Sequence, residues 1–321
     1  MRLFQNIMIA AAGLLIAHSA TASQSYPDRP VRIIVAYQPG QGTDIATRYF
    51  ADFLSRKLGQ SFYVENRAGA GGNIGTRAAA LADPDGYTLT MGTNATHALN
   101  AFLYSSPGFE PINDFEPIIL VGTFPMVMLT TPDTPFKNLD DILATVKTDP
   151  KSADFGMPST TARLVYELLK KQTGVELFGV PYKGSAMALS NLVGGEIPLS
   201  IDTIMAAQPQ LQAGRIKPIA VTGLEETELL PGVPTVASQG LPGFEVIAWN
   251  ALFAPKGTPE NIINTLNSAL NEFLALPETR KHLLGLGYDA GGGAPDRLAE
   301  LVQSESAKWG PIIEEAGIKF D

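Results

Sequence analysis

Short apolar runs alternate with amphipathic segments along most of the chain. Near its start, β-rich apolar runs at Val31–Tyr37, Phe62–Val64 and Tyr87–Met91 predict three strands. Between them, apolar residues recur at helical spacing in Thr43–Leu58 and Ile74–Ala82, which predicts two helices. This order of strands and helices favours a mostly parallel sheet that is covered by helices.

The alternation continues through the rest of the chain. The pattern predicts further strands at Met126–Thr131, Leu177–Val180 and Lys217–Thr222, and further helices at Leu139–Lys147, Thr161–Thr173, Ser185–Val193, Glu260–Leu276 and Pro295–Glu315. No fixed-period repeat, low-complexity tract or Gly/Ser-rich linker interrupts the series. If the chain forms two domains, packed strands therefore join them, and the apolar stretches Pro117–Thr123 and Val246–Ala254 are the expected crossings.

The first 22 residues carry the features of an export signal. Met1–Arg2 gives a positive start, Ile7–Ala17 is an apolar run, and Ala20–Ala22 is a small-residue cleavage site. We expect cleavage after Ala22 and a soluble mature protein of residues 23–321 in the periplasm. An uncleaved membrane anchor is disfavoured, because the run is shorter than the roughly 20 apolar residues that span a bilayer.

Composition narrows the class of protein. The chain has 321 residues, 45% apolar and 17% charged, so at ~150 residues per domain it has room for about two domains with their own cores. Its net charge of −9 argues against a nucleic-acid partner, which would need a basic face. The lack of cysteine excludes disulfides, thiol catalysis and a lipid on a mature N-terminal cysteine.

The sharpest local feature is the turn between the first predicted strand and the first long helix. Its glycines allow a ligand to approach the backbone, and the free N–H groups and positive dipole end of the helix point at the same spot. A dinucleotide fingerprint fails here, because its last glycine position is Ile45. A tight turn without a ligand stays an equal alternative to an anion site. The candidate binding residues are Tyr37, Gly40, Gln41, Gly42, Thr43 and Asp44.

Two turns in the second half repeat this arrangement of strand end, small or cap-type residues, and helix. Several helix N-termini at strand ends form a cleft between two α/β lobes, where ligands of open sheets lie. The candidates from these turns are Gly156, Ser159, Thr160, Tyr182, Lys183, Gly184, Ser185 and Ala186. A further Gly-rich turn, Gly69–Gly75, lacks the Gly-Lys-Ser/Thr of a phosphate-binding loop, and we give it a minor role near the cleft.

Constellations for catalysis are scarce. The chain lacks a Gly-x-Ser-x-Gly elbow, and its mature histidines, His97 and His282, lie far apart. The acidic residues show no metal-loop spacing, and export argues against a nucleotide cofactor, so we expect neither metal nor cofactor. Asn94 and His97 follow a strand end and are candidates for the cleft, and Asp202 is a further candidate.

A series of motifs resembles the Bug family, the extracytoplasmic solute receptors of tripartite tricarboxylate transporters. The matching segments occur in order over nearly all of the mature chain, and together they are highly specific. They are Tyr37–Asp44 with Arg48, Glu65–Gly75, Pro84–Leu89, Asp114–Pro117, Pro181–Ser185, Gly194–Glu196, Leu230–Thr235, Trp249 and Ala254–Pro259.

The resemblance implies a two-lobed α/β periplasmic binding protein of the type II-like architecture, each lobe a mostly parallel sheet flanked by helices, with the ligand cleft between them. With the crossings above, the first lobe would comprise residues 23–123 and 247–321, and the second residues 124–246. The resemblance also implies that backbone groups of Gly40–Asp44 and Tyr182–Ala186 hold one carboxylate, partly through ordered waters.

The same resemblance implies the function. The ligand would be a small carboxylate (a di- or tricarboxylate, an acidic amino acid or an aromatic acid), the partners the membrane permease subunits of a tripartite tricarboxylate transporter, and the protein a monomer without catalysis. Two other classes stay open: an exported hydrolase-like enzyme that uses the same cleft, and a ligand-sensing receptor that signals to a membrane sensor.

The chain departs from the family pattern at two positions that bear on the ligand. Gln41 stands where relatives commonly have a second glycine, and its amide could enter the cleft and narrow the range of ligands. Arg163 stands near the usual place of a histidine, where its guanidinium could pair with a distal carboxylate or face solvent. The sequence leaves open which carboxylate binds and whether either side chain touches it.

Overall fold

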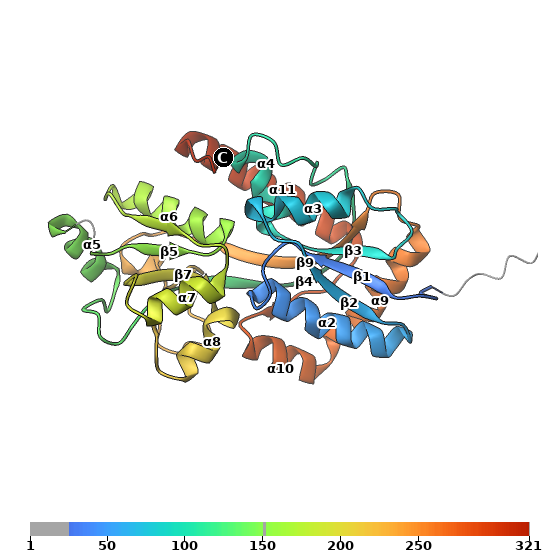
Figure 1. Cartoon of the computed structure of the whole chain (residues 1–321), viewed down its shortest axis with the longest axis horizontal. Coiled ribbons are helices and arrows are strands. Elements are labelled where there is room, and N and C mark those ends of the chain that lie inside the picture. The colour runs from blue at the N-terminus through green and yellow to red at the C-terminus, as the bar shows by residue number, and fades with distance from the viewer. Residues whose placement is uncertain (1–25, 150–151, 321) are drawn as a thin grey trace, which may run out of the picture.

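The computed structural model describes residues 26–149 and 152–320 (Figure 1). The predicted signal peptide, residues 1–22, lies outside the described residues. The described strands form one path, β2-β1-β3-β9-β4-β7-β5-β6, and β8 and β10 also pair with β4. We refer to the part built on β1, β2 and β3 as the first lobe, and to the part built on β5, β6 and β7 as the second lobe.

The first lobe confirms the predicted strand–helix alternation. Its strands β1 (Val31–Val35), β2 (Phe62–Asn66) and β3 (Thr88–Thr93) are parallel and are connected by α2 (Gly42–Leu58), η1 (Ala70–Gly72) and α3 (Asn73–Ala80). In α2, Ala46, Phe50 and Leu54 recur every four residues and are buried, which holds the helix against the sheet. The helix ends at Gly59, whose φ of 72° suits glycine at a left-handed cap.

The second lobe repeats the arrangement. Its parallel strands are β5 (Phe155–Met157), β6 (Gly179–Pro181) and β7 (Leu199–Thr203), its helices are α5 (Leu139–Thr148), α6 (Thr160–Thr173), α7 (Ser185–Val193) and α8 (Ile204–Gln212), and β8 (Lys217–Val221) and η3 (Ala237–Gln239) follow. The sequence pattern predicts no element between Val193 and Lys217, and the structure corrects this with β7 and α8. Buried Ser200 and Asp202 break the apolar run of β7, and Pro209 lies inside α8.

Two antiparallel strands run between the lobes. The strand β4 (Phe115–Thr130) pairs with β9 (Ile247–Pro255) from Phe115 to Pro125. It then pairs with β7 from Met126 to Thr130 and with β8 from Val127 to Thr130. Figure 1 shows β4 and β9 crossing the middle of the molecule. The expectation of mostly parallel sheets therefore holds for the outer strands, whereas the pairs that involve β4 and the β3–β9 pair are antiparallel.

The remaining elements pack mainly on the first lobe. They are η2 (Ala95–Leu99), α4 (Asn100–Leu103), α9 (Glu260–Ala275), α10 (Pro277–Gly285), β10 (Asp289–Ala290) and α11 (Pro295–Ala316). Both α9 and α11 lie against β4, and α11 also covers η2. Within residues 26–149 and 152–320, no helix combines the length and the apolar character needed to cross a membrane.

Candidate functional site

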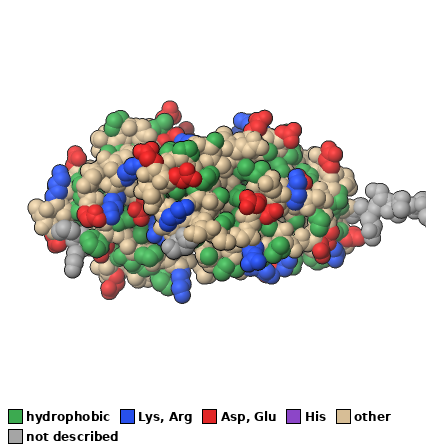
Figure 2. Space-filling view, turned by 90° about the horizontal axis from the view of Figure 1, so that it is seen from above, with side chains coloured by type: hydrophobic (Ala, Val, Ile, Leu, Met, Phe, Trp, Pro, Cys, Tyr) green, Lys and Arg blue, Asp and Glu red, His purple; other side chains and the backbone are tan. Residues whose placement is uncertain are grey.

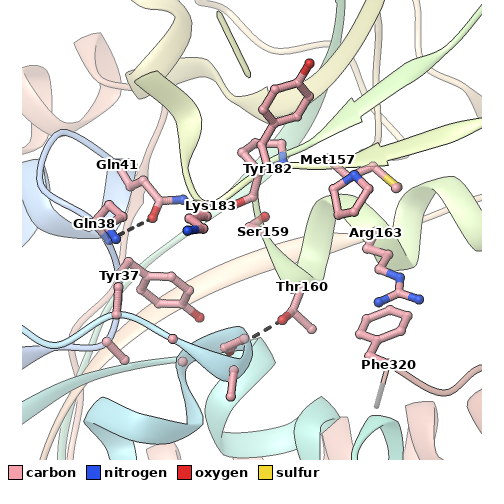
Figure 3. Close-up of a pocket in the computed structure, with 18 of the residues that line it drawn as sticks. Tyr37, Gln38, Gln41, Met157, Ser159, Thr160, Arg163, Tyr182, Lys183 and Phe320 are labelled. Carbon is pink, nitrogen blue, oxygen red and sulfur yellow. Dashed lines mark hydrogen bonds between the residues drawn. The ribbon is translucent and has the colours of Figure 1, made fainter. Parts of the chain in front are cut away.

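Two adjoining pockets lie where the lobes meet. The outer pocket has a volume of about 530 Å³, and the inner pocket about 30 Å³. Tyr37, Gln41 and Ser159 line both pockets and therefore stand at the boundary between them. Figure 3 shows the outer pocket, with the first-lobe turn on one side and the α6 side chains Arg163 and Thr160 on the other.

The inner pocket collects the N-termini of four helices, α2 and α6–α8. It is lined by Tyr37, Gln41, Gly42, Thr43, Thr93, Asn94, Phe124, Met126, Ser159, Thr161, Ser185, Asp202, Thr203 and Ala248. Its volume is large enough to admit water, since a cavity needs roughly 10–15 Å³ to hold one water molecule. Helix N-termini present N–H groups and a positive dipole end, so this arrangement suits an anion or a water that bridges to one.

The four helices differ in whether a side chain caps the backbone N–H groups of their first turns. In α6 the Ser159 hydroxyl accepts from Ala162 N at 3.2 Å, and in α8 the Thr203 hydroxyl accepts from Ala206 N at 3.2 Å. The first turns of α2 and α7 have no side-chain cap. A cap satisfies one N–H group, so the first turns of α2 and α7 keep more N–H groups for a ligand than those of α6 and α8, and both belong to turns that the sequence pattern indicates.

At the turn that leads into α2, Asp44 lines neither pocket and instead holds the loop through hydrogen bonds. Its carboxylate accepts from Gly40 N at 2.9 Å and from Asn66 Nδ2 at 2.8 Å, and Arg48 binds both oxygens, at 2.9 and 3.1 Å. Burial opposes ionisation, but these bonds outweigh it and hold the pKa of Asp44 below its usual value. Gly40 has a φ of 83°, which glycine adopts without strain, and it is exposed.

At the turn that leads into α7, both hydrogen bonds to the Asp202 carboxyl are made to the same oxygen. Ser185 Oγ donates to Asp202 Oδ1 at 2.8 Å, and Thr203 N donates to the same oxygen at 2.7 Å. Asp202 Oδ2 is buried without a hydrogen-bond partner among the described residues, and the residue lines the inner pocket. Burial raises the pKa of Asp202 to about 7, because desolvation disfavours the charged form more than these bonds favour it.

Several close contacts cross the cleft. Gln41 Nε2 donates to the Pro158 carbonyl at 3.2 Å, and Thr161 Oγ1 donates to Asn94 Oδ1 at 3.3 Å. Thr160 Oγ1 donates to the Gly71 carbonyl at 3.4 Å. A Cβ on Gly42 would lie 2.8 Å from Thr203 Oγ1, so only glycine lets α2 and α8 approach this closely. The lobes are therefore in contact around the inner pocket.

The outer pocket combines cations with aromatic walls. Lys183 and Arg163 are among its lining residues, whereas none of the described Asp and Glu residues lines it. The Arg163 guanidinium lies 3.8 Å from the centre of the Phe320 ring, and Figure 3 shows it stacked on that ring. Tyr37, Tyr104 and Tyr182 complete the aromatic lining. Such a pocket favours a ligand with negative charge and an apolar body.

The Gly-rich turn has a larger part in the outer pocket than the sequence indicates, because Gly69–Gly72 line one side of it. Gly69, Gly71 and Gly72 all have positive φ, and a Cβ on Gly71 would lie 2.6 Å from Thr160 Oγ1. The glycines therefore bring the first lobe's backbone against the start of α6.

His97 is not a cleft residue, which corrects the expectation from the sequence. Its ring is fully buried, stacks on Phe253 with ring centres 4.0 Å apart, and packs against Phe115. Its Nδ1 shares a hydrogen bond with Thr96 Oγ1, and burial lowers the pKa of His97 to about 3. The strand end that suggests exposure continues directly into η2, which carries the ring into the core.

Five other candidates line neither pocket: Gly40, Asp44, Gly156, Gly184 and Ala186. Gly156 lies in β5, where a Cβ would lie 2.5 Å from Ile197 Cδ1. Gly184 is extended, with a φ of 173°, and a Cβ there would lie 3.2 Å from Gln38 Cβ across the cleft. These glycines therefore allow close packing around the pockets.

Sequence reasoning missed several lining residues: Gln38, Tyr104, Phe124, Met126, Met157, Pro158, Thr161, Thr203, Ala248 and Phe320. A signal existed for Thr203, a cap-type residue that directly precedes the apolar residues Ile204 and Met205. Tyr104 and Phe320 are far apart in the chain, and only the fold brings them together. Within the residues that the structure describes, no cluster of three or more His, Asp or Glu could hold a metal ion.

Comparison with known proteins places the chain among solute receptors. The family profile described as "Tripartite tricarboxylate transporter family receptor" matches residues 46–318. Protein BugT of Bordetella pertussis is 34% identical over 317 residues, which is 98% of this chain and 96% of the relative. The chain therefore spans the relative almost completely.

Solved structures agree in fold. Rpa4515 of R. palustris, solved with adipate, has a TM-score of 0.88 and 36% identity over 92% of this chain and 100% of its own. The periplasmic binding protein BugD has a TM-score of 0.85 and 33% identity over 92% and 100% of the two chains. MatC of Rhodopseudomonas palustris, solved with malate, has a TM-score of 0.84 and 33% identity over 90% and 100%. With two lobes, a cleft at their junction and these matches, the chain belongs to the Bug family of tripartite tricarboxylate transporter receptors, which are periplasmic solute-binding proteins.

Proposed function

We propose that this protein captures a small carboxylate in the periplasm and delivers it to the membrane permease subunits of a tripartite tricarboxylate transporter. One observation carries the proposal: the uncapped first turns of α2 and α7 meet at a pocket beside Lys183 and Arg163. Uncapped helix N-termini bind anions through N–H groups and the helix dipole.

The charge of the molecule favours local capture over long-range steering. The chain has a net charge of −9, and the face shown in Figure 2 carries acidic and basic side chains interspersed, without a broad basic patch. An anion is thus not drawn in by the overall field. In the proposed complex, one carboxylate lies at the first turns of α2 and α7, directly or through a water in the inner pocket.

The outer pocket suits the rest of the ligand. The adipate and malate in the two solved relatives are both dicarboxylates, which supports the same class here. We place the ligand body against Tyr37 and Tyr104, and a second carboxylate near Arg163 or Lys183. The guanidinium of Arg163 is pre-positioned by its stacking on Phe320, which lowers the entropy cost of binding.

The proposed mechanism is closure of the lobes on the ligand. We place the lobe boundaries at residues 123/124 and 246/247, so that residues 23–123 and 247–321 form the first lobe and residues 124–246 the second. In support, β4 changes its pairing partners between Pro125 and Met126, and Val246 N bonds to the Thr222 carbonyl of the second lobe. We further propose export with cleavage after Ala22 and a monomeric receptor without enzymatic activity.

A thermal-shift screen followed by calorimetry tests the function. Malate, adipate and citrate are compared with adipamide, which keeps the length of adipate and removes both charges. A carboxylate at 100 times its Kd should stabilise the fold by about 2.7 kcal/mol, and adipamide should not. The bound acid should be recovered unchanged after long incubation. Stabilisation by adipamide alone, or appearance of a product, contradicts the proposal.

The place of the second carboxylate has its own test. Arg163→Ala should weaken adipate binding more than binding of a monocarboxylate of the same length, hexanoate. Arg215→Ala is the control, since Arg215 is exposed and lines neither pocket. Equal losses for both acids in Arg163→Ala would place the second carboxylate elsewhere.

A further inference from the structure

Gln41 is bound at both ends of its side-chain amide. Its Oε1 accepts from Gln38 N within the first-lobe turn at 3.0 Å, and its Nε2 donates to the Pro158 carbonyl of the second lobe at 3.2 Å. The side chain is buried, with 6% of the residue exposed. Figure 3 shows the bond to Gln38 and the amide reaching toward the second lobe. The amide therefore links the two lobes in the closed structure.

The same amide separates the two pockets. Gln41 lines both the inner pocket of about 30 Å³ and the outer pocket of about 530 Å³. It also borders the turn that leads into α7, since a Cβ on Gly184 would lie 3.6 Å from Gln41 Cδ. A ligand whose carboxylate lies at the uncapped helix ends and whose body fills the outer pocket must pass this side chain.

We propose that Gln41 is a carboxylate-binding residue that exchanges partners: its Nε2 leaves the Pro158 carbonyl and donates to a ligand carboxylate oxygen. This inference rests on the proposed function. When the lobes close without a ligand, the bond to Pro158 occupies the amide and favours the closed arrangement. With a ligand, the bond of Oε1 to Gln38 N keeps the amide oriented, so the Nε2 end is the one that moves.

The exchange is favourable on physical grounds. A hydrogen bond to a charged acceptor is stronger than one to a neutral carbonyl, so the ligand outcompetes Pro158 for the amide. The Pro158 residue lines the outer pocket, so its released carbonyl can bind water there and is not left buried without a partner. An amide is also uncharged, so the bond adds no repulsion between the residue and the rest of an acidic protein.

Two substitutions of similar size test the exchange. Gln41→Met keeps the length of the side chain and removes the amide, and Gln41→Glu keeps one acceptor oxygen and replaces the donor with a negative group. By calorimetry with adipate and malate, we expect at least tenfold weaker binding for Gln41→Met and at least 100-fold weaker binding for Gln41→Glu. Gln303→Ala, an exposed position on α11, serves as the control and should bind as the parent does.

A second readout concerns the unliganded protein. Loss of the bond to Pro158 should raise the radius of gyration of ligand-free Gln41→Met in small-angle scattering, and circular dichroism verifies that the variant is folded. If the parent binds adipate or malate and both Gln41 variants bind within twofold of it, the exchange is wrong and the proposed function stands. If the parent binds no carboxylate, the proposed function itself fails, and the exchange fails with it.

Discussion

The turns that enter α2 and α7 each lie beside a buried aspartate, and the two carboxyl groups are held in opposite ways. Asp44 receives hydrogen bonds on both oxygens, including a bidentate pair from Arg48, and its pKa lies below the usual value. Asp202 receives its bonds on one oxygen only, has no cation beside it in any described ion pair, and has a pKa raised to about 7.

The difference separates an aspartate that shapes a loop from one that keeps an oxygen available at the inner pocket. A carboxylate whose lone pairs are all in use shapes a loop and has nothing left for a partner. Asp202 keeps an oxygen beside the inner pocket that has no partner among residues 26–149 and 152–320, and its protonation state can change near neutral pH. The same residue type at two similar turns thus serves two purposes, which the surrounding donors decide.

Gly42→Val should produce the largest effect, because it separates the two turns. A Cβ at this position would lie 2.8 Å from Thr203 Oγ1, at the cap of α8, so the lobes could no longer close around the inner pocket. We expect adipate binding to weaken by at least 100-fold in calorimetry, while circular dichroism remains that of the parent. Gly285→Val is the control, since a Cβ there meets nothing within 4 Å. Parent-like binding by Gly42→Val would mean that capture does not need this contact.

Asp202→Asn should remove a pH dependence of binding. The raised pKa of about 7 means that Asp202 is mostly neutral at pH 6 and mostly ionised at pH 8, where it repels a bound carboxylate. The binding-competent fraction falls to about one tenth at one pH unit above the pKa, so parent affinity should drop roughly tenfold between pH 6 and pH 8. Asp202→Asn should bind equally at both pH values. A parallel pH profile for parent and variant in calorimetry would contradict this role.

The stability of the fold should also depend on the protonation of the Asp202 carboxyl. Since the folded-state pKa of Asp202 lies above its unfolded value, its protonation favours the fold at acidic pH, and this contribution is lost as the pH rises through about 7. Asp202→Asn should therefore gain melting temperature relative to the parent at pH 8 and less at pH 5. The reverse order would show that groups other than Ser185 and Thr203 stabilise the ionised carboxylate.

Asp44→Asn should cost stability more than affinity. The depressed pKa of Asp44 means that its ionised form favours the folded state at neutral pH, and this contribution is lost as the pH falls through its folded-state pKa. Losing the charge in its bonds with Arg48 should lower the free energy of unfolding by about 1–3 kcal/mol at pH 7 in urea titrations. Asp52→Asn, which breaks the exposed pair with Arg56 on the same helix, should cost less than 1 kcal/mol. Equal losses for the two variants would show that the bonds of Asp44 stabilise the fold no more than an exposed ion pair does.

Much of the fold could be predicted from hydrophobic periodicity. The helix α2 is long, has apolar residues on one face and ends at glycine, so its bounds differ from the prediction by one residue. The π-helical turn η2 was beyond this reasoning, because its five residues are all buried and show no face. The antiparallel course of β4 and β9 depends on pairing between segments more than a hundred residues apart, which local pattern does not specify.

Pocket-lining residues could be predicted where a single turn carries the whole sequence signal. Gly42 and Ser185 follow strand ends at helix starts, and both line the inner pocket. The sequence could not predict which way the candidate residues face. A Cβ on Gly184 would face Gln38 across the cleft, and the His97 ring lies in the core. The orientation of a residue depends on the neighbouring lobe and on packing, and the sequence of a single turn specifies neither.

Ser185→Ala should produce the smallest effect, and it tests the difference between Asp44 and Asp202 through a single hydrogen bond. It removes the hydroxyl that donates to Asp202 Oδ1, but leaves the bond from Thr203 N and the uncapped N–H groups of α7. One ordinary hydrogen bond corresponds to about 0.5–1.5 kcal/mol, so adipate binding should weaken by less than about tenfold at pH 6. Ser190→Ala, an exposed serine on the same helix, is the control.

The pH dependence then separates two explanations for that loss. The Ser185 hydroxyl favours the ionised form of Asp202, so without it the pKa of Asp202 should rise further, and the weakening of binding with pH should begin at a higher pH than in the parent. Calorimetry of Ser185→Ala from pH 6 to pH 9 measures this shift. A complete loss of binding by a folded Ser185→Ala would show that the hydroxyl itself holds the carboxylate. In that case the second turn would bind through its side chain, and the backbone of α7 would have no direct part in capture.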